Sequence, residues 1–283
     1  MKFCYYILLG LFFWGFHSSQ GLAQSNSYSP LVFGGKVFSE PAQKAATVYL
    51  SIDYGTSSCS GSYIGSSYVV TAAHCSVNAH PTISQVYFIY MNGDEIVCDV
   101  KEIISHPDYD EETVINDVAV WKVQCTDPRV QEIQPYLLDE NSTSPHDLYS
   151  LGYGRTSLTE YDHPYPQLKV LEEETLDLSD VINNDKYLND DKYIQAYKHV
   201  LSLVESGKIT CFKSNYNLLH GLYFGDSGGP TAYLNSDQNY VLYGVNSFIS
   251  RFYIDYKTAS DEGMSCVANV SYYADWIKQV TGR

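Results

Sequence analysis

The sequence predicts an all-β protein with two helical segments, and three observations support this fold class. Short runs in which apolar and polar residues alternate recur along the chain, which is typical of half-buried strands. Turn residues such as Asn92-Gly93-Asp94 separate two of these runs and indicate a hairpin. Helical spacing of apolar residues is clear only over 190–206 and 271–280. The 283 residues suffice for one large or two moderate cores.

The first residues have the pattern of a secretory signal peptide. Lys2 is followed by an apolar run over 3–16, and Gly21-Leu22-Ala23 places small residues at the positions that determine cleavage. We therefore expect residues 1–23 to be removed after Ala23 and the protein to be secreted. The apolar run is short for a membrane span, and no later stretch approaches the roughly 20 apolar residues that such a span needs.

The first half of the chain contains most of the clearly alternating runs. We expect strands at residues 47–53, 67–70, 85–91, 95–104 and 118–123. The polar segment 139–145 follows and indicates a linker. Within it, Asn141-Ser142-Thr143 is a glycosylation sequon, so Asn141 is expected to carry a glycan.

The second half contains the two helical stretches. Over 190–206, apolar residues recur at helical spacing, Asn189 or Asp190 can cap the helix, and Gly207 ends it. This helix either forms a binding exosite or packs its apolar stripe on the rest of the protein, and the second interpretation is favoured because surface helices ordinarily have such a stripe. The final helix over 271–280 should turn Trp276 and Ile277 toward the body of the protein.

A candidate nucleophile lies in the segment 225–230, Gly-Asp-Ser-Gly-Gly-Pro. Glycines around Ser227 allow a tight turn to which a substrate carbonyl can come close. The N–H groups of Gly225 and Ser227 would then point into one small space, where they could stabilise an oxyanion. Such a nucleophile needs a base and a group that orients the base, and the chain offers His74 after one strand and Asp117 before another.

These three segments resemble the histidine, aspartate and serine motifs of the chymotrypsin/trypsin family of serine proteases, and the resemblance extends from Val32 to Ile277. It implies two packed antiparallel six-stranded β-barrels within a peptidase domain over 32–283. The first barrel would cover about 32–140 and the second about 146–270, followed by the helix at 271–280. The helix at 190–206 would be an insertion in the second barrel.

The resemblance also implies a role for each motif residue. Ser227 would be the nucleophile, His74 the general base and Asp117 the group that orients it, while the N–H groups of Gly225 and Ser227 would form the oxyanion hole. Ser247 would hydrogen-bond Asp117. The implied activity is hydrolysis of protein or peptide substrates through an acyl-enzyme, with a protein inhibitor as a further partner. The alternative is a catalytically silent homologue that acts as a binding protein.

The family's activation route implies a zymogen. Residues 24–31 would be a short propeptide, and the new amino group of Val32 would pair with Asp226 after cleavage. Family zymogens commonly have Arg or Lys before this bond, whereas this chain has Leu31. Either a protease unlike trypsin makes the cut, or the enzyme reaches its active state differently.

The expected substrate pocket is uncharged. Gly221 stands where trypsin-like members have a pocket-floor aspartate, and Ile249 would narrow the entrance. A buried cation without a partner is costly, so we expect a preference for small or medium apolar side chains over Lys or Arg. The segment 250–263 is expected to be a long loop and contains Asp255, Asp261 and Glu262. If one of these acids entered the pocket, this preference would be reversed. The predicted substrate-binding residues are Gly221, Leu222, Ser247, Phe248, Ile249 and Ser265.

Removal of Cys4 with the signal peptide leaves six cysteines, and an even number in an exported protein favours disulfides over metal ligation. Alternative pairings are open on spacing alone. The resemblance implies a bridge from Cys59 to Cys75 beside His74, and the positions of the other four in the expected barrels suggest Cys98 to Cys125 and Cys211 to Cys266. Tyr223 stands where the family usually has a further cysteine.

The charge balance restricts the classes of partner. The formal net charge is −16, which argues against nucleic-acid binding because basic patches supply that affinity. No metal signature is evident in the sequence, so no metal or cofactor is expected. A soluble monomer that binds no membrane is the expected form.

Overall fold

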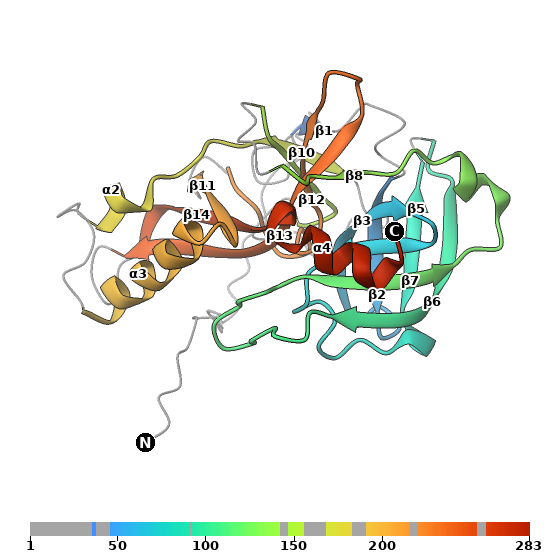
Figure 1. The fold of residues 1–283 in the computed structure, drawn as a ribbon, viewed down its shortest axis with the longest axis horizontal. Helices are drawn as coiled ribbons and strands as arrows, with labels where there is room; N and C mark the ends of the chain where they lie inside the picture. Colours follow the sequence, from blue (N-terminus) through green and yellow to red (C-terminus); the bar gives the residue numbers. More distant parts are fainter. Residues whose placement is uncertain are drawn as a thin grey trace, which may run out of the picture.

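The computed structural model describes residues 36–37, 46–90, 92–141, 147–155, 168–182, 191–215, 220–253 and 259–283. The predicted signal peptide at 1–23, the predicted propeptide at 24–31 and Val32 lie outside these described residues. Within the described part of the chain, no helix is long and apolar enough to cross a membrane. The strands fall into two groups, which occupy opposite sides of the molecule in Figure 1.

The first group is a closed antiparallel barrel of six strands in the order β2-β3-β4-β7-β6-β5. Its strands are β2 (Thr47–Ile52), β3 (Ser57–Gly65), β4 (Tyr68–Thr71), β5 (Gln85–Ile89), β6 (Glu95–Ser105) and β7 (Ala119–Gln124). The five strands predicted for this half agree with these bounds to within two residues. The predicted turn between β5 and β6 is also present, with Gly93 at φ +87°.

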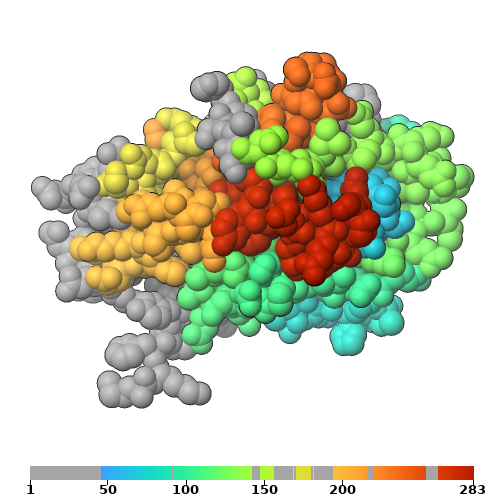
Figure 2. Space-filling view, in the orientation of Figure 1, coloured from blue at the N-terminus to red at the C-terminus, as the bar shows by residue number. Residues whose placement is uncertain are grey.

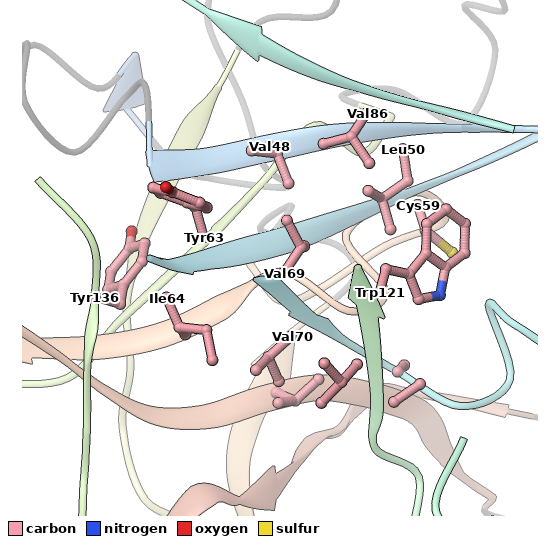
Figure 3. Close-up of a cluster of buried hydrophobic side chains, with 14 of the residues drawn as sticks. Val48, Leu50, Cys59, Tyr63, Ile64, Val69, Val70, Val86, Trp121 and Tyr136 are labelled. Atoms are coloured by element: carbon pink, nitrogen blue, oxygen red, sulfur yellow. The ribbon is translucent and has the colours of Figure 1, made fainter. Parts of the chain in front are cut away.

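Alternation along these strands fills the first barrel with apolar side chains. Val48 and Leu50 of β2, Val69 and Val70 of β4 and Trp121 of β7 are fully buried and point into one core in Figure 3. The indole N–H of Trp121 donates to Ser76 Oγ at 2.8 Å, so this buried ring leaves its polar atom satisfied. The barrel is therefore a packed support for the turns at its edge.

The second group contributes six strands from the C-terminal half, in the order β10-β9-β12-β13-β14-β11. They are β9 (Tyr149–Gly152), β10 (Lys169–Glu172), β11 (Ile209–Asn215), β12 (Pro230–Leu234), β13 (Tyr240–Tyr253) and β14 (Ala259–Asn269). The short strands β1 (Lys36–Val37) and β8 (Leu137–Leu138) pair with β10 and β13.

The residues directly after β10 return to the far edge of this sheet. Leu176 N donates to Cys211 O at 2.9 Å, and Lys213 N donates to Glu174 O at 2.8 Å. These bonds join the end of β10 to β11 and bring the six strands round into a ring. The predicted architecture of two six-stranded antiparallel barrels is thereby confirmed.

The longer helices pack against the barrels. The helices are η1 (Pro81–Ile83), η2 (Pro128–Glu132), α2 (Leu178–Ile182), α3 (Asp191–Glu205) and α4 (Val270–Thr281). Helix α3 buries Tyr197 and Leu203, and the Tyr197 ring lies 5.7 Å from that of Phe252 on β13. This packing supports the interpretation of the inserted helix as a surface helix.

Helix α4 lies between the two barrels in Figure 1 and occupies the middle of the face shown in Figure 2. Its residues Tyr273 and Ile277 are buried in one cluster with Trp121 of the first barrel and Val245 of the second. Trp276 packs against the same cluster. The expected inward orientation of Trp276 and Ile277 is therefore correct.

The segment 250–263 differs from the long loop that was expected. Strand β13 continues to Tyr253, β14 begins at Ala259, and Ser250 pairs with Met264 across the hairpin. Continued pairing in an antiparallel hairpin satisfies backbone groups that a loop would leave to water. Glu262 pairs with Asn215 of β11, Asp261 is exposed, and Asp255 lies outside the described residues.

All three expected disulfides are present. Cys98–Cys125 joins β6 to the end of β7, and Cys211–Cys266 joins β11 to β14. Cys59–Cys75 joins β3 to the turn after β4, where His74 lies. The sulfur atoms of Cys59 and Cys75 lie near the His74 ring but are bonded to each other, so they are not thiolate ligands for a metal.

Candidate active site

Pairing within the first barrel brings His74 and Asp117 together. His74 lies in the turn just after β4, and Asp117 lies just before β7. These two strands are neighbours, with Thr71 opposite Ala119. Ser227 lies in the turn before β12 of the second barrel, and its carbonyl accepts a hydrogen bond from the N–H of Ser60 on β3 at 2.8 Å. His74 and Asp117 thus lie at the edge of the first barrel, and the Ser227 backbone contacts β3 of that barrel.

The Asp117 carboxylate holds His74 through two hydrogen bonds. His74 Nδ1 lies 2.8 Å from Asp117 Oδ2, and the His74 backbone N–H donates to Oδ1 at 2.8 Å. Ser247 Oγ also donates to Oδ2, at 2.5 Å, as the resemblance to the family implied. An ionised carboxylate only accepts hydrogen bonds, so the proton of the neutral imidazole lies on Nδ1 and Nε2 is left as the acceptor.

Burial and charge act in opposite directions on this pair. Burial lowers the pKa of His74, but the negative charge of Asp117 and its hydrogen bond outweigh burial and raise that pKa above 6.5. Burial raises the pKa of Asp117, but the charge of His74 and the hydrogen bonds from His74 and Ser247 bring it below its ordinary value. Asp117 therefore stays ionised at neutral pH, and His74 is suited to take up a proton.

The Ser227 hydroxyl is not part of the hydrogen bonds around His74 among the described residues. Within the described residues, no hydrogen bond joins Ser227 Oγ to His74 Nε2, which lies 3.7 Å from Cys75 Sγ. The structure therefore brings His74, Asp117 and Ser247 into one hydrogen-bonded group and leaves the nucleophile outside it. Hydrogen bonds between catalytic groups are often long without substrate and shorten when it binds.

The turn 224–227 orients two N–H groups. The carbonyl of Phe224 accepts from Arg155 N at 2.9 Å, and that of Asp226 accepts from Gly229 N at 3.0 Å and Asn246 Nδ2 at 3.2 Å. In a trans peptide the N–H points away from the carbonyl, so these bonds also fix the N–H groups of the residues that follow, Gly225 and Ser227. Within the described part of the chain, no protein acceptor occupies either N–H.

Gly225 is required by its surroundings. Its φ is +97°, and a Cβ there would lie 2.9 Å from the Cα of Gly154. Such a φ is strained for other residues, and the close backbone leaves no room for a side chain. The glycine thus allows the turn to pack against the segment 152–154 while its N–H stays open.

The Asp226 side chain is fully buried behind the nucleophile turn. Its oxygens accept from Gly154 N at 2.8 Å and Tyr223 N at 2.9 Å. Burial, reinforced by the charge of Asp226, raises the pKa of the nearby Glu173 to about 8. A pKa of about 8 means that the buried Glu173 is mainly protonated at neutral pH.

Four of the six predicted pocket residues lie together in a small, neutral cluster. Ser265 Oγ lies 2.6 Å from Ser214 Oγ and accepts from Leu222 N at 3.0 Å. A Cβ on Gly221 would lie 2.7 Å from Ser214 Oγ, so the two hydroxyls occupy the space beside the glycine. Ile249 pairs with Ser265 across the strands and packs against the cluster that contains Leu222.

Phe248 and Ser247 take different positions along β13. Ser247 turns toward Asp117, while Phe248 packs against the apolar cluster beneath helix α3. Within the described residues, the side-chain hydrogen bonds of Ser214 and Ser265 join neutral groups only. Four of the six predicted pocket residues thus lie in one region, whereas Ser247 is directed toward Asp117 and Phe248 toward the inserted helix.

Sequence reasoning missed Ser60, Asn246 and Ser214. Each is a buried polar residue on a strand, and each contacts the nucleophile turn or the pocket cluster. Ser60 directly follows Cys59 and Asn246 directly precedes Ser247. The sequence did offer a signal for these two residues. Each is a polar residue next to a predicted site residue at a position expected to be buried, and a buried polar group needs a hydrogen-bond partner.

Two antiparallel barrels with a histidine–aspartate pair on one and a glycine-flanked serine on the other define a class of serine hydrolases. The trypsin family model matches residues 34–277. The chain is 30% identical to a collagenase of Hypoderma lineatum over 243 residues, which cover 79% of this chain and 76% of the collagenase. It is 27% identical to trypsin II-P29 of Gallus gallus over 232 residues, covering 81% and 82%, and 25% identical to granzyme F of Mus musculus over 226 residues, covering 78% and 79%.

The chain therefore belongs to the trypsin family of serine proteases. Its activity is that of a serine endopeptidase, and its substrates are proteins or peptides.

Proposed function

We propose that the protein is a secreted endopeptidase in which Ser227 is the nucleophile, His74 the general base and Asp117 the group that orients the base. The observation that carries this proposal is the Asp117 carboxylate, buried and hydrogen-bonded to both His74 and Ser247. It supplies the tautomer in which Nε2 can accept the proton of a serine hydroxyl.

The reaction proceeds in two displacements. Ser227 Oγ attacks the substrate carbonyl carbon and gives its proton to His74 Nε2, while the carbonyl electrons move to oxygen and form an oxyanion. The oxyanion collapses, the C–N bond breaks, and the departing amine takes the proton from His74. Water then repeats the sequence on the acyl-enzyme and releases the acid. The charge of Asp117 stabilises the imidazolium in both halves.

The N–H groups of Gly225 and Ser227 would stabilise the oxyanion. Fixed donors of this kind act where charge develops, and loss of one typically costs about 2.7–4 kcal/mol of transition-state stabilisation. The bonds from Arg155, Gly229 and Asn246 to the turn's carbonyls support this role because they leave both donors directed away from the protein.

Activation by the Val32 amino group is part of the proposal. The new ammonium group would pair with the Asp226 carboxylate, which is fully buried behind the nucleophile turn. We expect the enzyme to be made as a zymogen with a short propeptide at 24–31. We also expect the enzyme to be secreted as a monomer and to be glycosylated at the exposed Asn141. It should be susceptible to a protein inhibitor and should bind neither nucleic acid nor membranes.

The preferred substrate side chain in the pocket is proposed to be small or medium and apolar. The neutral Ser214–Ser265 pair offers no charge for Lys or Arg, and Ile249 reduces the space. Efficient cleavage after Arg, with poor cleavage after Ala, Val or Leu, would contradict this preference.

The substitution Ile249→Gly should enlarge the pocket. We expect kcat/KM for cleavage after Phe to rise about tenfold or more, and that for cleavage after Val to fall, because each lost methylene contact is worth about 1–3 kcal/mol. Paired peptides that differ only at this side chain provide the measurement. Val97→Gly, at an exposed strand position remote from the site, controls for the effect of a new glycine. An unchanged Phe-to-Val ratio would exclude Ile249 from the pocket.

The alternative function is a silent homologue that binds proteins or peptides without cleaving them. The two are separated by the intact mass of the secreted protein before and after exposure to an organophosphorus serine probe. We expect one adduct, on Ser227, in a chain that begins at Val32. An adduct on a chain that begins elsewhere would remove the Val32–Asp226 pairing and keep the protease. No adduct on the chain beginning at Val32 would favour the binding protein.

A further inference from the structure

Ser60 makes three hydrogen bonds that tie the two barrels together beneath the nucleophile turn. It is fully buried on β3 of the first barrel. Its Oγ donates to the Gly225 carbonyl at 2.8 Å and accepts from the Tyr153 N–H of the second barrel at 2.9 Å. Its backbone N–H donates to the Ser227 carbonyl at 2.8 Å. Gly225 and Ser227 provide the two proposed oxyanion donors, and Ser60 therefore hydrogen-bonds the carbonyl of each of them.

The same residue is linked covalently to the base. Cys59 precedes Ser60, and its disulfide leads to Cys75, which follows His74. The path from the Gly225 carbonyl to His74 thus runs through one hydroxyl, one strand residue and one disulfide. A path this short fixes the position of the turn 224–227 relative to the barrel that carries His74 and Asp117.

The turn needs such an anchor because of its glycines. Gly225 and Gly228 have φ values of +97° and +78°, and glycine changes conformation at low cost. The Phe224 carbonyl is held by Arg155, and the Asp226 carbonyl by Gly229 and Asn246. All of these anchors belong to the second-barrel half of the chain. The carbonyl of Gly225, which lies between Phe224 and Asp226, is instead held to the first barrel by its hydrogen bond from the Ser60 hydroxyl.

We propose that Ser60 is a positioning residue whose hydroxyl, by bridging the Gly225 carbonyl and the Tyr153 N–H, sets the oxyanion hole in register with His74. The inference rests on the proposed function, because it assigns the hole to Gly225 and Ser227. Its consequence is specific: loss of the hydroxyl should weaken stabilisation of the oxyanion and leave ground-state binding of the peptide nearly unchanged.

The test is the substitution Ser60→Ala in the activated enzyme. It removes one oxygen and keeps the backbone bond to Ser227. We expect kcat to fall on the order of 10- to 100-fold with little change in KM, since a displacement of about 1 Å in a catalytic group can cost about that much. A peptidyl trifluoromethyl ketone, which forms an oxyanion with the nucleophile, should lose affinity by the same factor. The matching peptidyl alcohol, which cannot form one, should bind as before.

Ser62→Ala is the matched control. Ser62 lies two residues away on the same strand and is fully buried, but its Oγ has no hydrogen-bond partner among the residues that the structure describes. It should retain normal kcat and normal affinity for both inhibitors. If Ser60→Ala does not fold, as judged by thermal unfolding, Ser60→Gly is measured in the same way.

The outcomes are separable from those of the proposed function. Wild-type enzyme that neither cleaves peptides nor reacts with the serine probe would overturn the proposed function itself. Active wild type with an equally active, folded Ser60→Ala variant would overturn only the role of Ser60. Equal loss of affinity for the ketone and the alcohol would also overturn it, because it would indicate general disturbance of the site.

Discussion

Replacement of Ser227 by alanine is expected to lower kcat by about six orders of magnitude. The substitution removes the oxygen that forms the acyl-enzyme, and the remaining base and orienting groups cannot substitute for it because they act as a unit. The Ser227 N–H stays in place, so peptide binding should be nearly unchanged. Initial rates with a peptide that has Val or Ala at the cleaved position, together with binding of the peptidyl alcohol, measure both quantities.

The control for this variant is Ser62→Ala, which makes the same change at a buried serine of the first barrel. Titration of wild-type enzyme with the organophosphorus probe gives the concentration of active sites and thus a limit on contaminating protease. A Ser227→Ala protein with full peptidase activity after this correction would refute Ser227 as the nucleophile. Equal, negligible rates for wild type in its activated form and for the variant would instead support the silent homologue.

Five strands of the first barrel could be predicted from sequence because the responsible signals are local, whereas the two-barrel architecture was expected from the resemblance to the family. Alternation marked β2, β5, β6 and β7 to within two residues, since a strand with one buried face needs an apolar residue at every second position. The pairing of β13 with β14 beyond Ser250 was not predicted, because the segment 250–263 contains many polar residues and its cross-strand pairing is not marked by a regular alternation of apolar residues.

The candidate site was predictable only in part for a related physical reason. His74, Asp117 and Ser227 lie in short motifs, whereas the group that holds them depends on contacts between distant segments. Ser60 and Gly225 are separated by 165 positions, and Asn246 reaches back to Leu151 over 95. No local pattern contains that information, because a buried serine or asparagine looks the same in sequence whichever partner satisfies it.

The substitution Asp117→Asn should lower kcat by about 10⁴-fold, the loss typical of this change in a serine–histidine–aspartate triad. The side-chain amide keeps the shape of the carboxylate but can donate to His74 Nδ1. The imidazole would then have its proton on Nε2 and could not accept the proton of Ser227. Asp108→Asn, at an exposed position of the same loop, is the control, and the Ser227→Ala protein sets the background rate.

The pH profile distinguishes this mechanism from simple damage to the site. Only neutral His74 accepts a proton, so wild-type kcat/KM should rise with pH through an acid limb whose pKa is above 6.5, because Asp117 raises the pKa of His74. In Asp117→Asn the stabilising charge is absent while burial still disfavours the imidazolium, so the acid limb should move to lower pH. Profiles of kcat/KM from about pH 5 to 9 measure the shift. An acid limb that stays in place, or moves to higher pH, would show that Asp117 does not set the protonation of the base, even if the rate has fallen.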